Sequence, residues 1–245
     1  KAGYHAVTFG FLVDQIIRRV DEKHRSQAQF FQEEIAAPNG IEFYIGLPMS
    51  EEYRVARIVS PPLRVAVREM VSSQRTVLMM VNLGARKVKK DPIPKAIGTT
   101  TKFLISPTKI NPINNPEIHQ LEIASANGIG TAIALAKIIS LLQEGKLFSE
   151  NMLNILKQPV IVDHIDVVIG LTKSKGYGFV YKESLENIPN QWLIGHSGYG
   201  GQNVQYDPKH DLAYAYITNG LKCAEDISRS QMRLQKSLYK CLKQA

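Results

Sequence analysis

The sequence has 245 residues, of which 44% are apolar and 21% are charged, and its formal net charge is +8. This composition provides enough apolar surface for a folded core and argues against intrinsic disorder. The basic residues are spread along the chain, and the one dense cluster, residues 86–90, contains no aromatic residue for base stacking, so we expect no nucleic-acid partner.

The first part of the chain is predicted to be mainly helical. Residues 4–20 place apolar side chains three and four positions apart, which predicts a helix with one buried face. Ser26 is a suitable N-cap for a second helix over residues 26–36. Residues 41–47 alternate as a strand does, and residues 61–80 predict a helix with two prolines in its first turn.

The middle of the chain changes in character. Residues 83–117 contain five prolines, which rule out a long regular element and predict a surface excursion. Residues 128–143 then predict a helix with a face of small residues, and residues 148–156 a shorter helix capped by Ser149.

The last part of the chain predicts an antiparallel meander followed by a helix. Four segments have strand character and are separated by Gly, Asn and Asp-Pro turns: residues 176–181, 191–196, 203–206 and 212–219. The amphipathic residues 225–242 should lie across one face of that sheet. We therefore predict an α+β fold, an antiparallel sheet flanked by helices, in a single domain over residues 1–245.

Residues 195–201, Gly-His-Ser-Gly-Tyr-Gly-Gly, are the strongest candidate for an active site. They place the His196 imidazole and the Ser197 hydroxyl at the end of a predicted strand, before glycines that let a ligand approach the backbone. A glycine-rich hairpin turn with an exposed histidine is the plainer alternative. The G-x-S-x-G elbow of α/β-hydrolases is excluded, because Tyr199 stands where its last glycine belongs.

Residues 195–219 resemble the third motif and following hairpin of the serine β-lactamase and penicillin-binding-protein superfamily, in its class C β-lactamase, esterase and LACTB-like branch. The motif is K-T-G in much of that superfamily and H-x-G in many esterase-like members, and His196-Ser197-Gly198 matches the second form. The resemblance implies a β-lactamase/transpeptidase-like fold. It also implies that Ser197, Gly198 and Tyr199 contact substrate, with an oxyanion contact from the Gly198 and Tyr199 backbone.

Two further stretches agree with this family in order and distance. Gly3-Tyr4-His5-Ala6 resembles the second motif, which makes Tyr4 the general base and His196 its electrostatic and proton-transfer partner. Residues 123–142 resemble the family's glycine-rich entry to a helix. Ala6 departs from the pattern, because the third position of the motif is usually polar, so we expect an ester or peptide-like substrate rather than a β-lactam.

The family's nucleophile is the serine of an S-x-x-K motif that precedes the tyrosine motif. Tyr4 stands at the start of this sequence, so we expect the serine and lysine upstream of Lys1 and a chain that is N-terminally truncated relative to the family. Two S-x-x-K strings occur here, at residues 106–109 and 237–240. We interpret both as chance matches, because the first lies in the proline-rich excursion and the second follows the third motif.

The resemblance therefore predicts a serine hydrolase that acts through an acyl-enzyme, of which this chain alone is inactive. A pseudoenzyme of the same fold, used for binding or self-assembly, is the alternative, and an incomplete gene product that does not fold alone is a third. We expect a small-molecule substrate and leave a homo-oligomer open. No apolar run reaches the roughly 20 residues of a membrane span, so no membrane span is expected.

Cofactor and metal sites are not expected. No G-x-G-x-x-G fingerprint occurs in a βαβ context, and the six histidines lack the spacing of a zinc helix. Cys223 and Cys241 form neither a disulfide framework nor a metal-ligand pattern. Reduced thiols favour an intracellular location, cytoplasmic or mitochondrial.

Overall fold

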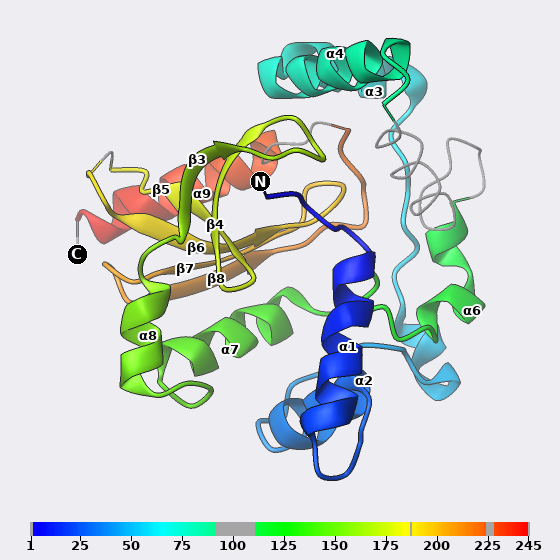
Figure 1. Cartoon of the computed structure of the whole chain (residues 1–245), viewed down its shortest axis with the longest axis vertical. Helices are drawn as coiled ribbons and strands as arrows, with labels where there is room; N and C mark the ends of the chain where they lie inside the picture. The colour runs from blue at the N-terminus through cyan, green and yellow to red at the C-terminus, as the bar shows by residue number, and fades with distance from the viewer. Residues whose placement is uncertain (1, 92–110, 187, 224–227, 245) are drawn as a thin grey trace.

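The computed structural model describes residues 2–91, 111–186, 188–223 and 228–244, and its centre is a six-stranded antiparallel sheet (Figure 1). The strands pair in chain order, so the sheet is a meander in which every connection joins neighbours. Its strands are β3 Ile161–Ile165, β4 Thr172–Gly176, β5 Phe179–Glu183, β6 Trp192–Ser197, β7 Asn203–Asp207 and β8 Leu212–Tyr216. The predicted α+β class is confirmed.

Helices cover both faces of the sheet, with α7 (Ala132–Gln143) on one side and α9 (Arg229–Leu242) on the other (Figure 1). The short helix α8 (Glu150–Leu156) follows α7. Hydroxyl side chains immediately before these helices accept backbone N–H groups of the first turn, which fixes where the helices begin. These caps are Thr131, Ser149 and Ser228.

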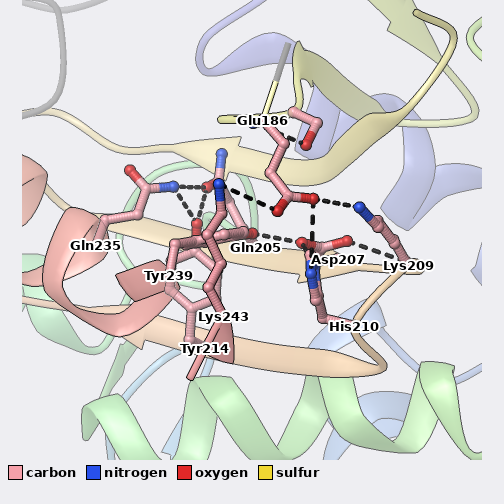
Figure 2. A network of polar contacts seen from close by, with 10 residues as sticks. Glu186, Gln205, Asp207, Lys209, His210, Tyr214, Gln235, Tyr239 and Lys243 are labelled. Atoms are coloured by element: carbon pink, nitrogen blue, oxygen red, sulfur yellow. Dashed lines mark hydrogen bonds and ion pairs between the residues drawn. The ribbon is translucent and has the colours of Figure 1, made fainter. Parts of the chain in front are cut away.

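Polar contacts fasten α9 to the sheet (Figure 2). The Tyr239 hydroxyl donates to Asp207 Oδ2 at 2.5 Å, and the Gln235 amide donates to Gln205 Oε1 at 3.2 Å. Tyr214 lies between the two glutamines and bonds to both. Because Asp207 and Gln205 are almost completely buried, these bonds satisfy polar groups that would otherwise destabilise the fold.

The helical part of the chain precedes the sheet. Its elements are α1 Thr8–Val20, α2 Gln27–Phe30, the π-helix η1 Phe31–Ala36, β1 Phe43–Tyr44, which pairs with β2 Ile129–Gly130, η2 Met49–Arg54, α3 Leu63–Ser72, α4 Gln74–Val88, η3 Pro112–Asn114 and α6 Pro116–His119. Ser26 caps the second helix, α2, as predicted, and the cap is a full capping box.

The apolar face of α1 is exposed, which corrects the expectation of a buried face. Phe9, Leu12, Ile16 and Val20 are 50%, 61%, 59% and 74% exposed. Gly10 is the buried residue of this helix, and it lies against the Ser125 backbone and side chain. The helix therefore has the predicted periodicity, but most of its apolar face is exposed, and only Val13 and Ile17 of that face are half-buried.

Several predicted boundaries were wrong. The helix predicted at residues 61–80 is two helices that meet at Ser73, whose hydroxyl caps the second. That second helix runs to Val88, so a regular element enters the range 83–117; residues 92–110 of that range lie outside the described residues. The helix at residues 4–20 begins at Thr8, the helix predicted from residue 128 begins at Ala132, and the strand at residues 41–47 shrinks to two residues.

The strand predicted at residues 176–181 is instead a tight hairpin between β4 and β5. Gly176 pairs with Phe179, and the two residues between them, Tyr177 and Gly178, have φ values of 52° and 85°. Positive φ at both positions of a two-residue loop is the geometry of a type I′ turn. The hairpin adds β4 to the sheet, and β3, which was not predicted, lies beside it.

The helices of the described ranges are all too short or too polar to cross a membrane.

Candidate active site

The candidate site lies at the end of β6. Ser197 pairs with Asn203 across the turn to β7, and Gly195 pairs with Gln205 two residues earlier. The two strands approach so closely at Gly195 that an added Cβ would lie 2.1 Å from the Val204 carbonyl oxygen. The glycine therefore determines how near the end of β6 lies to its neighbour.

Tyr4 and His196 are brought together at this strand end. Their rings stack with centroids 5.7 Å apart and an interplanar angle of 27°. The segment before α1 reaches this position by pairing with the turn after β3, where the Val167 N–H donates to the Ala2 carbonyl at 2.9 Å. The two residues assigned to catalysis from the sequence are thus in contact, although they lie far apart in the sequence.

The His196 ring has a defined tautomer and a lowered pKa. Its Nδ1 lies 2.7 Å from the Ser197 carbonyl oxygen, which can only accept, so Nδ1 carries the proton and Nε2 of the neutral ring is an acceptor. Burial is the main cause that lowers the pKa of His196. The bond to the Ser197 carbonyl opposes this, and the charges of Lys173, Lys182 and Lys175 lower the pKa further.

The Ser197 side chain is held by two neighbouring strands. The Lys182 ammonium of β5 donates to its Oγ at 2.8 Å, and Ser197 donates to Asn203 Oδ1 of β7 at 3.2 Å. Asn203 is 2% exposed, and its Nδ2 has no hydrogen-bond partner among the described residues. The hydroxyl assigned to substrate contact therefore already holds β5, β6 and β7 together at the site.

The loop after β6 contains both backbone N–H groups that were assigned to an oxyanion contact, those of Gly198 and Tyr199. The Gly198 N–H donates to the Gln202 carbonyl at 2.9 Å, which closes the turn and occupies one of the two groups assigned to an oxyanion contact. No described residue accepts the N–H of Tyr199, whose side chain is 58% exposed. Gly200 and Gly201 have φ values of 81° and 100°, so this turn requires glycine at both positions.

Three residues of the site were missed in the sequence. Lys182 reaches Ser197, and Lys175 forms an ion pair with the buried Asp166 in front of the Tyr4 ring. The sequence contains a signal for Lys175, because Lys173 and Lys175 alternate in Thr172–Gly176 as side chains on one face of a strand do. That segment has too little apolar character to have been recognised as a strand.

The described residues offer no alternative nucleophile of the S-x-x-K type beside Tyr4. Ser237 and Lys240 are exposed on α9, which packs against Asp207 and Gln205 of the sheet. The string at residues 106–109 lies outside the described residues. In the same described ranges, no group of three His, Cys, Asp or Glu side chains is arranged to hold a metal ion.

The chain is similar to known proteins over most of its length. A family model described as Beta-lactamase matches residues 1–235. The chain is 26% identical over 232 residues to the esterase/beta-lactamase LipL of Mycobacterium tuberculosis (strain ATCC 25618 / H37Rv), a match that covers 90% of this chain and 49% of that protein. The chain thus spans about half the length of its curated relative.

Two solved structures share the fold at similar identity. A penicillin-binding protein homologue from Caulobacter crescentus is 27% identical with a TM-score of 0.71, and the match covers 98% of this chain and 59% of that one. A family VIII carboxylesterase is 26% identical with a TM-score of 0.70, and the match covers 98% and 58%. Because the Beta-lactamase model matches residues 1–235, which is nearly the whole chain, the chain belongs to the beta-lactamase family.

Proposed function

We propose that this chain forms the base and oxyanion side of the acyl-transfer site in a serine hydrolase that cleaves ester or peptide-like bonds. The observation that carries the proposal is the stacking of Tyr4 on His196, with ring centroids 5.7 Å apart. Family membership supports it, as do relatives named esterase/beta-lactamase and carboxylesterase. Ala6 beside Tyr4 has no polar side chain for a substrate amide, which favours esters over β-lactams.

The proposed reaction begins when a serine hydroxyl attacks the substrate carbonyl carbon. Its proton passes to the phenolate oxygen of Tyr4, and the Tyr199 N–H donates to the carbonyl oxygen as it becomes an oxyanion. The bond to the leaving group then breaks, and the leaving alcohol or amine takes the proton from Tyr4. We assign the neutral His196 ring, whose Nε2 can accept, as the proton-transfer partner of Tyr4. Water then attacks the acyl-enzyme, gives its proton to Tyr4, and releases the acid and the serine, which takes the proton back.

We place the nucleophilic serine and its lysine outside this sequence, so that this chain alone is inactive. The support is the exposed apolar stripe of α1, formed by Phe9, Leu12, Ile16 and Val20, on the helix that directly follows Tyr4. Apolar stripes of this kind usually pack against further protein. The same stripe favours the second candidate function, a non-catalytic member of the fold that self-associates through α1.

The test compares this chain with the longer protein encoded by extending the reading frame upstream of Lys1. A fluorophosphonate probe, which acylates activated serines, is expected to label the longer protein and not this chain. In the longer protein, Tyr4→Phe should lower p-nitrophenyl acetate hydrolysis by about 10²- to 10⁴-fold, because it removes the proton acceptor. Tyr53→Phe is the matched control, since Tyr53 is 85% exposed.

Labelling of this chain by the probe would contradict a nucleophile outside the sequence. Hydrolysis that survives Tyr4→Phe would remove the general base from the proposal. A longer protein that takes no label, together with concentration-dependent association of this chain that Leu12→Glu abolishes, would select the non-catalytic candidate.

A further inference from the structure

Two side chains of different charge lie beside the Tyr4 ring, the neutral His196 and the positively charged Lys175. His196 stacks on its ring with the centroids 5.7 Å apart. The Lys175 ammonium lies 6.0 Å from the centre of the same ring, within the range of a cation–π contact. The tyrosine is therefore bordered by a cation that does not belong to the third motif.

A buried carboxylate fixes the position of this cation. Asp166 is 1% exposed and forms an ion pair with Lys175. It also accepts the N–H groups of Val168 and Ile169 at 2.8 and 3.0 Å. Burial alone would raise the pKa of Asp166, but the bonds from Lys175 and from the backbone amides of Ile169, Val168 and Tyr4 outweigh it and lower the pKa.

Asp166 therefore connects the lysine and the tyrosine. It contacts the Tyr4 backbone amide on one side and the Lys175 ammonium on the other. Close packing supports this arrangement, because an added Cβ on Gly3 would lie 2.8 Å from Val168 Cγ2. Movement of Lys175 or Asp166 would consequently be transmitted to Tyr4.

The third motif does not supply a positive charge of its own. Its first residue is His196, and burial together with nearby lysine charges holds the pKa of that ring below the usual value, so it is neutral at pH 7. The charged and polar groups that face it are Tyr4 from the N-terminal segment, Lys173 and Lys175 from β4, Lys182 from β5 and the Ser197 carbonyl. The charge near the site thus comes from the β4–β5 hairpin.

We propose that Lys175, held by the buried Asp166, is the positioning residue of Tyr4 and supplies the positive charge that favours its phenolate form. The proposal rests on the role of Tyr4 given above. A cation 6.0 Å from the centre of a phenol ring stabilises the anionic form, and a shared carboxylate keeps the two at a constant separation. An ion pair that only braced the β3–β4 hairpin would affect folding without affecting titration or turnover.

The first experiment uses this chain and needs no activity. The His196 ring signal is assigned with a His196→Asn variant and titrated by NMR. Lys175→Met is expected to raise the pKa of His196, because it removes a positive charge that disfavours the protonated ring, whereas Lys175→Arg should leave it near the wild-type value. Lys157→Met, which changes an exposed lysine bonded to Asn154, is the control and should leave the titration unchanged.

A combined Asp166→Asn and Lys175→Met variant covers the case in which Lys175→Met leaves Asp166 unpaired and prevents folding. It should show a smaller rise in the pKa of His196, because the negative charge of Asp166 is removed as well, and it leaves no buried charge unpaired. The nuclear Overhauser contact between the Tyr4 and His196 rings should persist in Lys175→Arg and be lost in Asp166→Ala. An unchanged His196 titration in both Lys175→Met variants would overturn the proposal.

The second experiment measures ester hydrolysis by the longer protein. Lys175→Met should lower kcat by about 100-fold with little change in KM, as expected for a misplaced base, and Lys175→Arg should restore most of it. Equal losses in the Met and Arg variants would overturn the proposal. If Tyr4→Phe leaves hydrolysis intact, the proposed function fails by itself, and the NMR titration still decides whether Lys175 acts on this pair.

Discussion

The two ends of β7 carry polar clusters that differ in one respect. At one end, Asp207 accepts the Tyr239 hydroxyl at 2.5 Å, the His210 ring at 2.8 Å and the Lys209 N–H at 2.9 Å (Figure 2). At the other end, Asn203 is equally buried, but its Nδ2 has no partner among the described residues. We call the first cluster closed, because both carboxylate oxygens of Asp207 have partners, and the second open, because the Asn203 amide has a donor without one among the described residues.

This difference separates a structural role from a chemical one. A buried polar network in which each group has a partner stabilises one packing of its elements, here α9 on the sheet. A buried donor without a partner costs stability and needs a separate explanation. The open end is also where Tyr4 stacks on His196, the residue before Ser197 in β6.

The largest expected effect comes from separating β6 from β7, the strand that carries both polar clusters. Gly195→Ala places a Cβ 2.1 Å from the Val204 carbonyl oxygen, so β6 and β7 must separate. We expect a loss of about 3 kcal/mol in the free energy of unfolding, measured by urea denaturation. Gly84→Ala is the control, because nothing lies within 4 Å of its added Cβ and it should not destabilise the chain. A stable Gly195→Ala variant would contradict the close approach.

The next effect compares the two ends directly. Asp207→Ala leaves the Tyr239 hydroxyl and the His210 ring without their acceptor and should cost about 2 to 3 kcal/mol. Asn203→Ala removes one hydrogen bond and an unsatisfied donor together, so it should cost about 1 kcal/mol or less. Equal losses in urea denaturation would show that the distinction between closed and open clusters is wrong.

The sequence predicted the elements that have local signals, and the two motif residues Tyr4 and His196 that it singled out lie in contact. Ser26 and Ser149 cap helices as expected, because a cap depends only on the next few residues. The β4–β5 hairpin was missed because Tyr177 is an unusual residue for a position with positive φ. The Lys175–Asp166 pair depends on the pairing of β3 with β4, which no local pattern reports.

A smaller effect is expected in the pH dependence of stability. His196 binds a proton less readily in the folded chain than in the unfolded one, because its pKa is lowered from 6.5. The unfolded state therefore holds more protons below pH 6.5, and the free energy of unfolding should fall as the pH drops from there through the folded-state pKa, by at most about 1.4 kcal/mol per pH unit. Urea denaturation of His196→Asn between pH 5 and 7.5 should lack this contribution, and an identical profile would contradict it.

The smallest effect concerns the hairpin turn. Tyr177 has a φ of 52°, a conformation that asparagine adopts more easily. Tyr177→Asn should raise the free energy of unfolding by up to about 1 kcal/mol, visible as a higher midpoint in thermal denaturation. The His196 titration should not change, since the turn itself does not touch the ring. A lower midpoint would argue against a type I′ turn.

This turn also sets the register of the strands on either side. With two residues between Gly176 and Phe179, Lys175 is aligned with Val180 and faces Asp166 and Tyr4. Because neighbouring side chains of a strand point to opposite faces, a register shift of one residue would turn Lys175 away from the tyrosine. The turn therefore decides which β5 residue lies beside Lys175, while the pairing of β4 with β3 brings Lys175 to Asp166.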